Sequence, residues 1–88
     1  MKKYFLSYST ITKDYYLDYG CFDRDRVNLG KVEGEKLTKK LKDIIKVHRK
    51  TVLYSEITLD NSVKELLLKD FKNTSVKVQF AKNLESLC

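Results

Sequence analysis

Apolar and aromatic residues alternate with polar ones along much of this chain, and this period of two is the strongest constraint on its fold. The alternation runs through 1–22, where the polar stretch 12–14 interrupts it, and it returns over 51–59 and 75–81. Side chains of a β-strand point alternately to opposite faces, so each segment is predicted to be a strand with one buried face. The two aromatic-rich runs on either side of 12–14 predict a β-hairpin.

Two other segments have the longer period of an α-helix. In 33–50, five residues recur at the three- and four-residue intervals that place side chains on one face of a helix. This stripe consists of Leu37, Leu41, Ile44, Ile45 and His48. Segment 62–73 has a similar apolar stripe, and Ser62 with Glu65 matches a capping box at its start. The last residues, 82–88, are predicted to form a tail that frays or adds a turn of helix.

This order of elements predicts one small α+β domain over 1–88. The chain is long enough for one core and too short for a second domain. The expected fold is a four-stranded sheet in the order ββαβαβ, with both helices on one face because crossovers between parallel strands are right-handed. A hydrophobic content of 42% and a charged content of 34% exclude a membrane protein and an evidently disordered chain.

The chain contains two cysteines, Cys21 and Cys88, far apart in the sequence. The short apolar run near the N-terminus is broken by hydroxyl residues, so no secretory signal is expected. Cysteines without such a signal are expected to be reduced thiols, which predicts a cytoplasmic location. A disulfide between Cys21 and Cys88 is the less favoured alternative.

Positive charge is concentrated in one part of the chain. The formal net charge is +6, and residues 31–50 contain eight cations and three anions, a balance of +5. On a helix over 33–50, the face opposite the apolar stripe carries Lys36, Lys39, Lys40, Lys46 and Lys50. Such a stripe is predicted to follow phosphates or to meet an acidic protein surface. The alternative is a solvated face that keeps a small protein soluble.

Tyrosines form the second cluster, because five of the six lie in the first nineteen residues. Two helices cover only one face of a sheet, so some of these rings are expected on the open face. The rings proposed for binding are Tyr8, Tyr16 and Tyr19. Only Lys3 and Lys13 stand among these aromatic residues, which favours a protein interface over stacking on bases. The alternative is that the rings pack and keep their hydroxyl groups wet.

No motif in the chain specifies a catalytic chemistry. His48 falls on the apolar stripe and is expected to be structural, and Cys21 with His48 matches no nucleophile signature. The three glycines form no phosphate-binding loop, so no cofactor is predicted. A Mg²⁺ site is a minor alternative, and its candidate ligands are Asp18, Asp23, Asp25 and Glu56. Arginines beside Asp23 and Asp25 argue against it, so neither a metal nor a catalytic residue is predicted.

These patterns together predict a small, basic, non-enzymatic binding protein. It would act by protein contact on a nucleic-acid-processing enzyme or a ribonucleoprotein, through an acidic surface of that partner. Small size and a Lys- and Tyr-rich composition typical of AT-rich coding suit a phage or mobile-element inhibitor of a host defence system. The first alternative is direct, sequence-independent nucleic-acid binding, and the second is a metal-dependent nuclease. No membrane partner is expected, and the sequence does not decide between a monomer and a homodimer.

Overall fold

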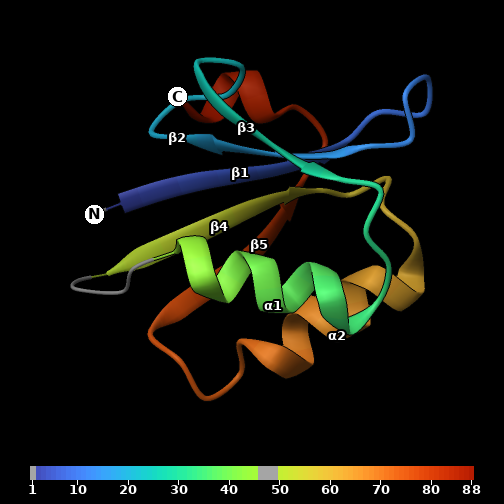
Figure 1. Ribbon diagram of the computed structural model, residues 1–88. Coiled ribbons are helices and arrows are strands. Elements are labelled where there is room, and N and C mark those ends of the chain that lie inside the picture. Colours follow the sequence, from blue (N-terminus) through green and yellow to red (C-terminus); the bar gives the residue numbers. More distant parts are fainter. Residues whose placement is uncertain (1, 46–49) are drawn as a thin grey trace.

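A mixed sheet of five strands carries two α-helices on one face in the computed structural model (Figure 1). The structure describes residues 2–45 and 50–88. In chain order the elements are β1 (Lys2–Tyr8), β2 (Tyr15–Tyr19), β3 (Asp25–Gly30), α1 (Glu35–Ile44), β4 (Thr51–Glu56), α2 (Asn61–Asp70), β5 (Val76–Ala81) and the 3-10 helix η1 (Leu84–Leu87). The predicted α+β class with two helices is therefore confirmed.

The sheet has one strand more than the sequence predicted. Its strand order is β3-β2-β1-β4-β5, with antiparallel pairs on the β1–β2–β3 side and parallel pairs on the β1–β4–β5 side. The added strand is β3, which lies between the predicted hairpin over 1–22 and the predicted helix over 33–50. It has only two apolar residues, Val27 and Leu29. An edge strand needs few buried side chains, because backbone pairing with β2 holds it in the sheet.

The main core lies between the sheet and the two helices. Leu6 of β1 and Leu17 of β2 are fully buried, as is Leu53 of β4. From the helices, Leu37, Leu41 and Leu67 pack into the same cluster. The buried strand residues, which recur every second position, therefore pack against the buried residues of α1, which recur every three or four positions. Together they form one layer between the sheet and the helices.

The other face of the sheet has a smaller core of its own. Phe5 of β1 is fully buried there and stacks on Tyr54 of β4, with ring centroids 5.4 Å apart. Figure 1 shows η1 on this side of the sheet, opposite the two α-helices. Val52 and Leu84 are also buried but lie outside the main cluster, and η1 contacts β4. The predicted tail is thus a cover for the back of the sheet.

A disulfide between Cys21 and Cys88 joins this cover to the chain just beyond β2. The prediction of two free thiols is therefore wrong. Two hydrogen bonds hold the same region: the backbone N–H of Phe22 donates to Cys88 Sγ at 3.3 Å, and Lys3 Nζ donates to the carbonyl of Leu87 at 3.1 Å. The spacing of the two cysteines in the sequence does not predict the bond, because they come together only when the C-terminal segment crosses the back of the sheet.

Both helices differ from their predicted ranges. The helix expected over 33–50 is α1, which ends at Ile44 because Ile45 takes an extended conformation with a ψ of 103°. The helix expected over 62–73 is α2, which begins at Asn61 and has no side-chain hydrogen bond at its N-cap, so the capping box is wrong. No helix in the described ranges is long and apolar enough to cross a membrane.

Candidate functional site

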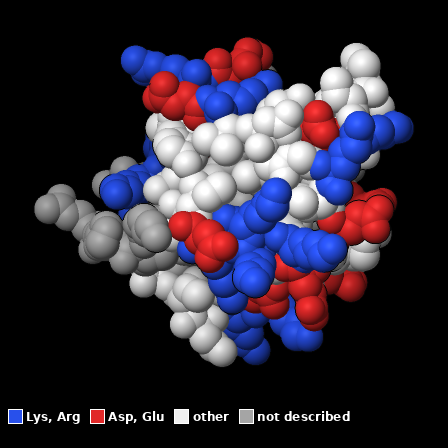
Figure 2. All heavy atoms as spheres, in the orientation of Figure 1, with Lys and Arg blue, Asp and Glu red and all other residues white. Residues whose placement is uncertain are grey.

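The exposed face of α1 carries the charge that the sequence assigned to it. Lys36 and Lys39 are both exposed, and Figure 2 shows Lys and Arg atoms gathered over this helix, with acidic atoms beside them. Within residues 2–45 and 50–88, both ion pairs involve Arg26. Neither Lys36 nor Lys39 therefore has a partner among the described residues, and their charges face solvent.

The remaining lysines of the predicted stripe do not extend this surface. Lys40 Nζ donates a hydrogen bond to the carbonyl of Leu29 at 2.9 Å, so its ammonium group ties α1 to the end of β3. Lys50 lies just before β4 and beyond the end of α1. Lys46 falls outside the described residues. Because α1 ends at Ile44, the five-lysine stripe is corrected to an exposed pair, Lys36 and Lys39, which we call the α1 lysine pair.

The three tyrosines proposed for binding lie on opposite faces of the sheet. Tyr8 and Tyr19 are partly buried against the main core. Tyr16 alternates to the back face, where the Arg26 guanidinium lies 4.8 Å from its ring centroid. The rings therefore do not form one platform. The prediction that some tyrosines occupy the face without helices holds for Tyr16 alone among the three.

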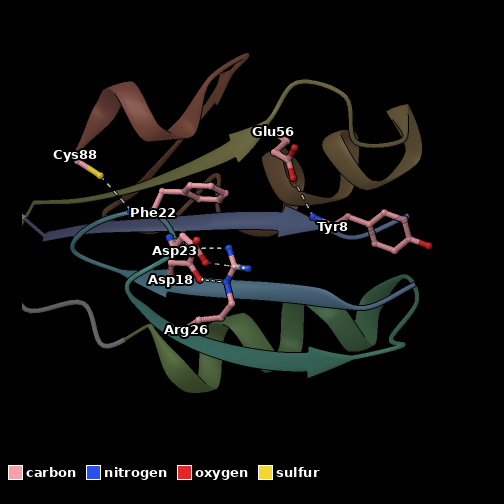
Figure 3. A network of polar contacts seen from close by, with 7 residues as sticks. All are labelled: Tyr8, Asp18, Phe22, Asp23, Arg26, Glu56 and Cys88. Carbon is pink, nitrogen blue, oxygen red and sulfur yellow. Dashed lines mark hydrogen bonds and ion pairs between the residues drawn. The ribbon is translucent and has the colours of Figure 1, made fainter. Parts of the chain in front are cut away.

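The back face contains a buried polar network centred on Asp18 (Figure 3). The carboxylate is fully buried and accepts two hydrogen bonds from Arg26, from Nε at 2.8 Å and from Nη2 at 3.0 Å. The backbone N–H of Asp23 donates a third, at 2.6 Å. Hydrogen bonding to Asp18 raises the pKa of Arg26, and the guanidinium also lies 5.3 Å from the ring centroid of Phe22. The network fixes the β2–β3 loop against the sheet.

Three of the four residues considered for a metal site, Asp18, Asp23 and Glu56, have other partners, and the fourth, Asp25, is exposed. Both oxygens of Asp18 are held by Arg26 and Asp23, and Glu56 Oε1 accepts from the backbone N–H of Tyr8 at 3.0 Å. The described part of the chain holds no cluster of three or more potential metal ligands. The other candidates for chemistry are also unsupported: Cys21 is disulfide-bonded, and His48 lies outside the described residues.

A hollow of about 820 Å³ lies at the end of the sheet where β1, β3 and β4 finish. Its walls are the three loops that follow these strands. The rings of Tyr8 and Tyr15 line it together, with their centroids 4.7 Å apart. Sequence reasoning missed this site because it depends on which strands are neighbours. The only sequence feature that could have indicated the hollow was the polar loop after each strand. Such loops occur in most small sheets, so they do not identify a site.

Tyr15 is expected to ionise only above the ordinary range for tyrosine. Burial, and then the nearby Tyr8, Asp60 and Glu33, raise its pKa above 10.0. The folded state therefore holds the phenolic proton more tightly than the unfolded state does. This contribution to stability is complete below about pH 10 and is lost as the pH rises through the raised pKa.

A chemical-denaturation series from neutral to alkaline pH, with tyrosinate absorbance as a second readout, tests this. Tyr15→Phe should lose less stability above about pH 10 than the wild-type protein does. Ser75→Ala, which removes an exposed hydroxyl from the loop before β5, is the control and should follow the wild type. An identical alkaline loss in the wild type and in Tyr15→Phe would contradict the assignment.

Comparisons of this chain with protein-family models, with curated proteins and with solved structures each found no match. The fold and its side-chain contacts are therefore the basis for assigning a function.

Proposed function

We propose that this chain is a small basic binding protein that acts by contact, with the α1 lysine pair as the centre of the contact. The observation that supports it is the exposure of Lys36 and Lys39 without a partner among the described residues. Unpaired surface charge attracts an oppositely charged surface over about 10 Å at moderate salt. The proposed partner presents acidic side chains and belongs to a nucleic-acid-processing enzyme or a ribonucleoprotein.

Two features favour a protein partner over bare nucleic acid. Sequence-independent binding to a duplex rests on several phosphate contacts, roughly six to ten in well-studied cases. The helix α1 offers fewer cations, namely the α1 lysine pair and the exposed Lys42, whose ammonium group lies 5.8 Å from the ring centroid of Phe71. Single strands bind where aromatic rings stand beside cations on one open surface. Here the three rings proposed for binding share no surface, because Tyr8 and Tyr19 lie on the helix side of the sheet and Arg26 of the same chain covers Tyr16 on the other side. Direct nucleic-acid binding is thus the alternative outcome of the test.

The proposed mode of action is occlusion, in which the domain covers a surface that the partner needs. A phage or mobile-element inhibitor of a host defence enzyme is the setting in which we place it, because a domain of this size can act by covering alone. No catalytic step is proposed.

Reversing the charge of the α1 lysine pair is expected to abolish partner capture. The variant Lys36→Glu/Lys39→Glu should bind its partner at least about tenfold more weakly, since each reversal removes one attraction and adds one repulsion. The matched control is Lys69→Glu/Lys72→Glu, which reverses two exposed lysines on and just after α2. Quantitative affinity purification from cells that carry the candidate partner measures the loss for both variants.

The same two variants are titrated with DNA and RNA oligonucleotides over a range of salt concentrations. A partner that is retained by the control and lost by the α1 variant supports the proposal. Equal retention by both variants would contradict it. Tight oligonucleotide binding that falls steeply with salt would replace the protein partner with nucleic acid.

The cytoplasmic location is part of the proposal, and the Cys21–Cys88 disulfide is the feature that opposes it. Reducing compartments keep most protein thiols free, whereas oxidising ones preserve disulfides. If the protein acts in the cytoplasm, we expect both cysteines to react with a thiol-alkylating reagent in rapidly quenched cells. The mass shift of the protein measures this. A bridge that persists in quenched cells would move the protein to an oxidising compartment.

A further inference from the structure

The hollow lies where an open sheet most often holds a ligand. At the ends of the parallel neighbours β1 and β4, the chain turns away in opposite directions, from β1 toward β2 and from β4 toward α2 and β5. Sheets with parallel strands bind ligands outside the carboxyl ends of their strands at such a reversal. The hollow of about 820 Å³ lies at this end, and its size falls within the range typical of small-molecule sites, roughly 300–1,000 Å³.

The floor of the hollow is apolar and aromatic. The partly buried rings of Tyr8 and Tyr15 meet there at an interplanar angle of 51°. Leu59, which is buried, and Val63 complete the floor from the loop before α2 and from its first turn. A planar ring on this floor would contact aromatic and aliphatic surface, which is the usual basis for binding a nucleobase.

The rim of the hollow carries groups of both charges. Lys13 and Lys31 stand on two of the loops, and neither has an ion-pair or hydrogen-bond partner for its ammonium group among the described residues. Glu33 and Asp60 line the same hollow, close enough to influence the phenol of Tyr15. The best-matched ligand therefore combines a planar ring, an anionic group for the lysines and hydroxyl donors for the carboxylates.

We infer that the hollow binds a nucleoside phosphate. Its base lies against Tyr8 and Tyr15, its ribose hydroxyls donate to Glu33 or Asp60, and its phosphate meets Lys13 and Lys31. Carboxylates commonly accept from ribose hydroxyls in nucleotide sites, and lysines bind phosphate as point charges. An aromatic amino acid carries similar groups but would occupy a small part of this volume. The inference is independent of the partner contact proposed for α1, because Lys36 and Lys39 do not line the hollow.

The test is a titration of ¹⁵N-labelled full-length protein, followed by NMR, with AMP and with its two parts, adenosine and ribose 5-phosphate. AMP is expected to bind with a Kd of about 1 mM or lower, and at least about fivefold more tightly than either part. Shifts should centre on Tyr8, Tyr15 and the loop before α2. GMP and UMP show whether the site prefers one base. Free tyrosine is the amino-acid control.

Several results would overturn the inference. They are no saturable shifts with any nucleotide, equal affinity for AMP and ribose 5-phosphate, or tighter binding of free tyrosine than of AMP. A short RNA that binds far more tightly than AMP, with shifts spread along α1, would instead identify a nucleic-acid surface.

Two variants separate the parts of the site. Lys13 has a φ of 64°, a conformation that asparagine also adopts, so Lys13→Asn/Lys31→Gln removes both amines with little change to the turn. It should reduce AMP affinity at least fivefold, to the level of adenosine, while Lys69→Gln/Lys72→Gln binds like the wild type. Tyr15→Leu should reduce AMP affinity to the level of ribose 5-phosphate. Unchanged AMP binding in both site variants would contradict the assignment.

The α1 variant distinguishes failure of this inference from failure of the proposed function. Lys36→Glu/Lys39→Glu should keep AMP affinity within about twofold at 150 mM salt, because neither side chain lines the hollow and salt weakens the effect of exposed charges on it. A tenfold loss of AMP affinity in this variant would place the nucleotide on α1 and overturn the hollow as its site.

Discussion

Replacing Arg26 with methionine is expected to lower the free energy of unfolding by about 3 kcal/mol. The Asp18 carboxylate is fully buried and receives two of its three hydrogen bonds from the Arg26 guanidinium. Without Arg26 the carboxylate keeps only the Asp23 N–H and has no opposing charge. Removal of one partner from a buried pair typically costs ~3–5 kcal/mol, and the lower end applies because the Arg26 side chain is 32% exposed.

Urea denaturation measures this loss, and the neighbouring arginine supplies the control. Arg24 is exposed and has no partner among the described residues, so Arg24→Met should change stability by less than about 0.5 kcal/mol. Asp18→Leu/Arg26→Met removes both charges and should be more stable than Arg26→Met alone. Equal losses for Arg24→Met and Arg26→Met would show that the network adds nothing to the fold.

Reduction of the Cys21–Cys88 disulfide is expected to cost up to about 4 kcal/mol, because the bond closes a loop with a sequence separation of 67. A small domain has about 5–15 kcal/mol of stability, so a loss of this size is a large share of the total. The loss of stability should first affect the C-terminal segment that covers the back of the sheet. Leu84 is held against β4 by a short 3-10 helix, the Lys3–Leu87 hydrogen bond and the disulfide.

Hydrogen exchange with and without a dithiol reductant locates the loss. The backbone amides of 84–88 and of the loop at Phe22 should lose protection, while Leu41 and Leu67 in the main core stay protected. The chain has no other cysteine, so Cys21→Ser/Cys88→Ser should resemble the reduced protein and ignore the reductant. Unchanged stability and exchange on reduction would show that the cover holds without the bond.

The strands and the α1 stripe could be predicted because each has a period that one face of the sheet or helix enforces. Leu6, Leu17 and Leu53 lie in segments with this alternation, and all three are fully buried. The strand β3 could not be found in this way. Its Val27 and Leu29 are too few to establish a period, and its place in the sheet comes from pairing with β2.

The candidate sites depended on features that the sequence pattern does not contain. The lysine stripe assumed a helix that continues to residue 50, but the chain becomes extended at Ile45. Lys40 looked free because its acceptor, the Leu29 carbonyl, lies in the unrecognised strand. The hollow and the disulfide both join segments that meet only when strand order is known. Local periodicity carries no information on strand order.

The most direct test of the proposed contact is photo-cross-linking from α1 itself. A benzoylphenylalanine in place of Glu35 leaves both Lys36 and Lys39 intact, and one in place of Glu65 on α2 is the matched control, because both glutamates are exposed. We expect a discrete cross-linked protein from position 35, attached near acidic residues, and none from position 65. The same products from both positions, or nucleic acid alone at position 35, would contradict the account.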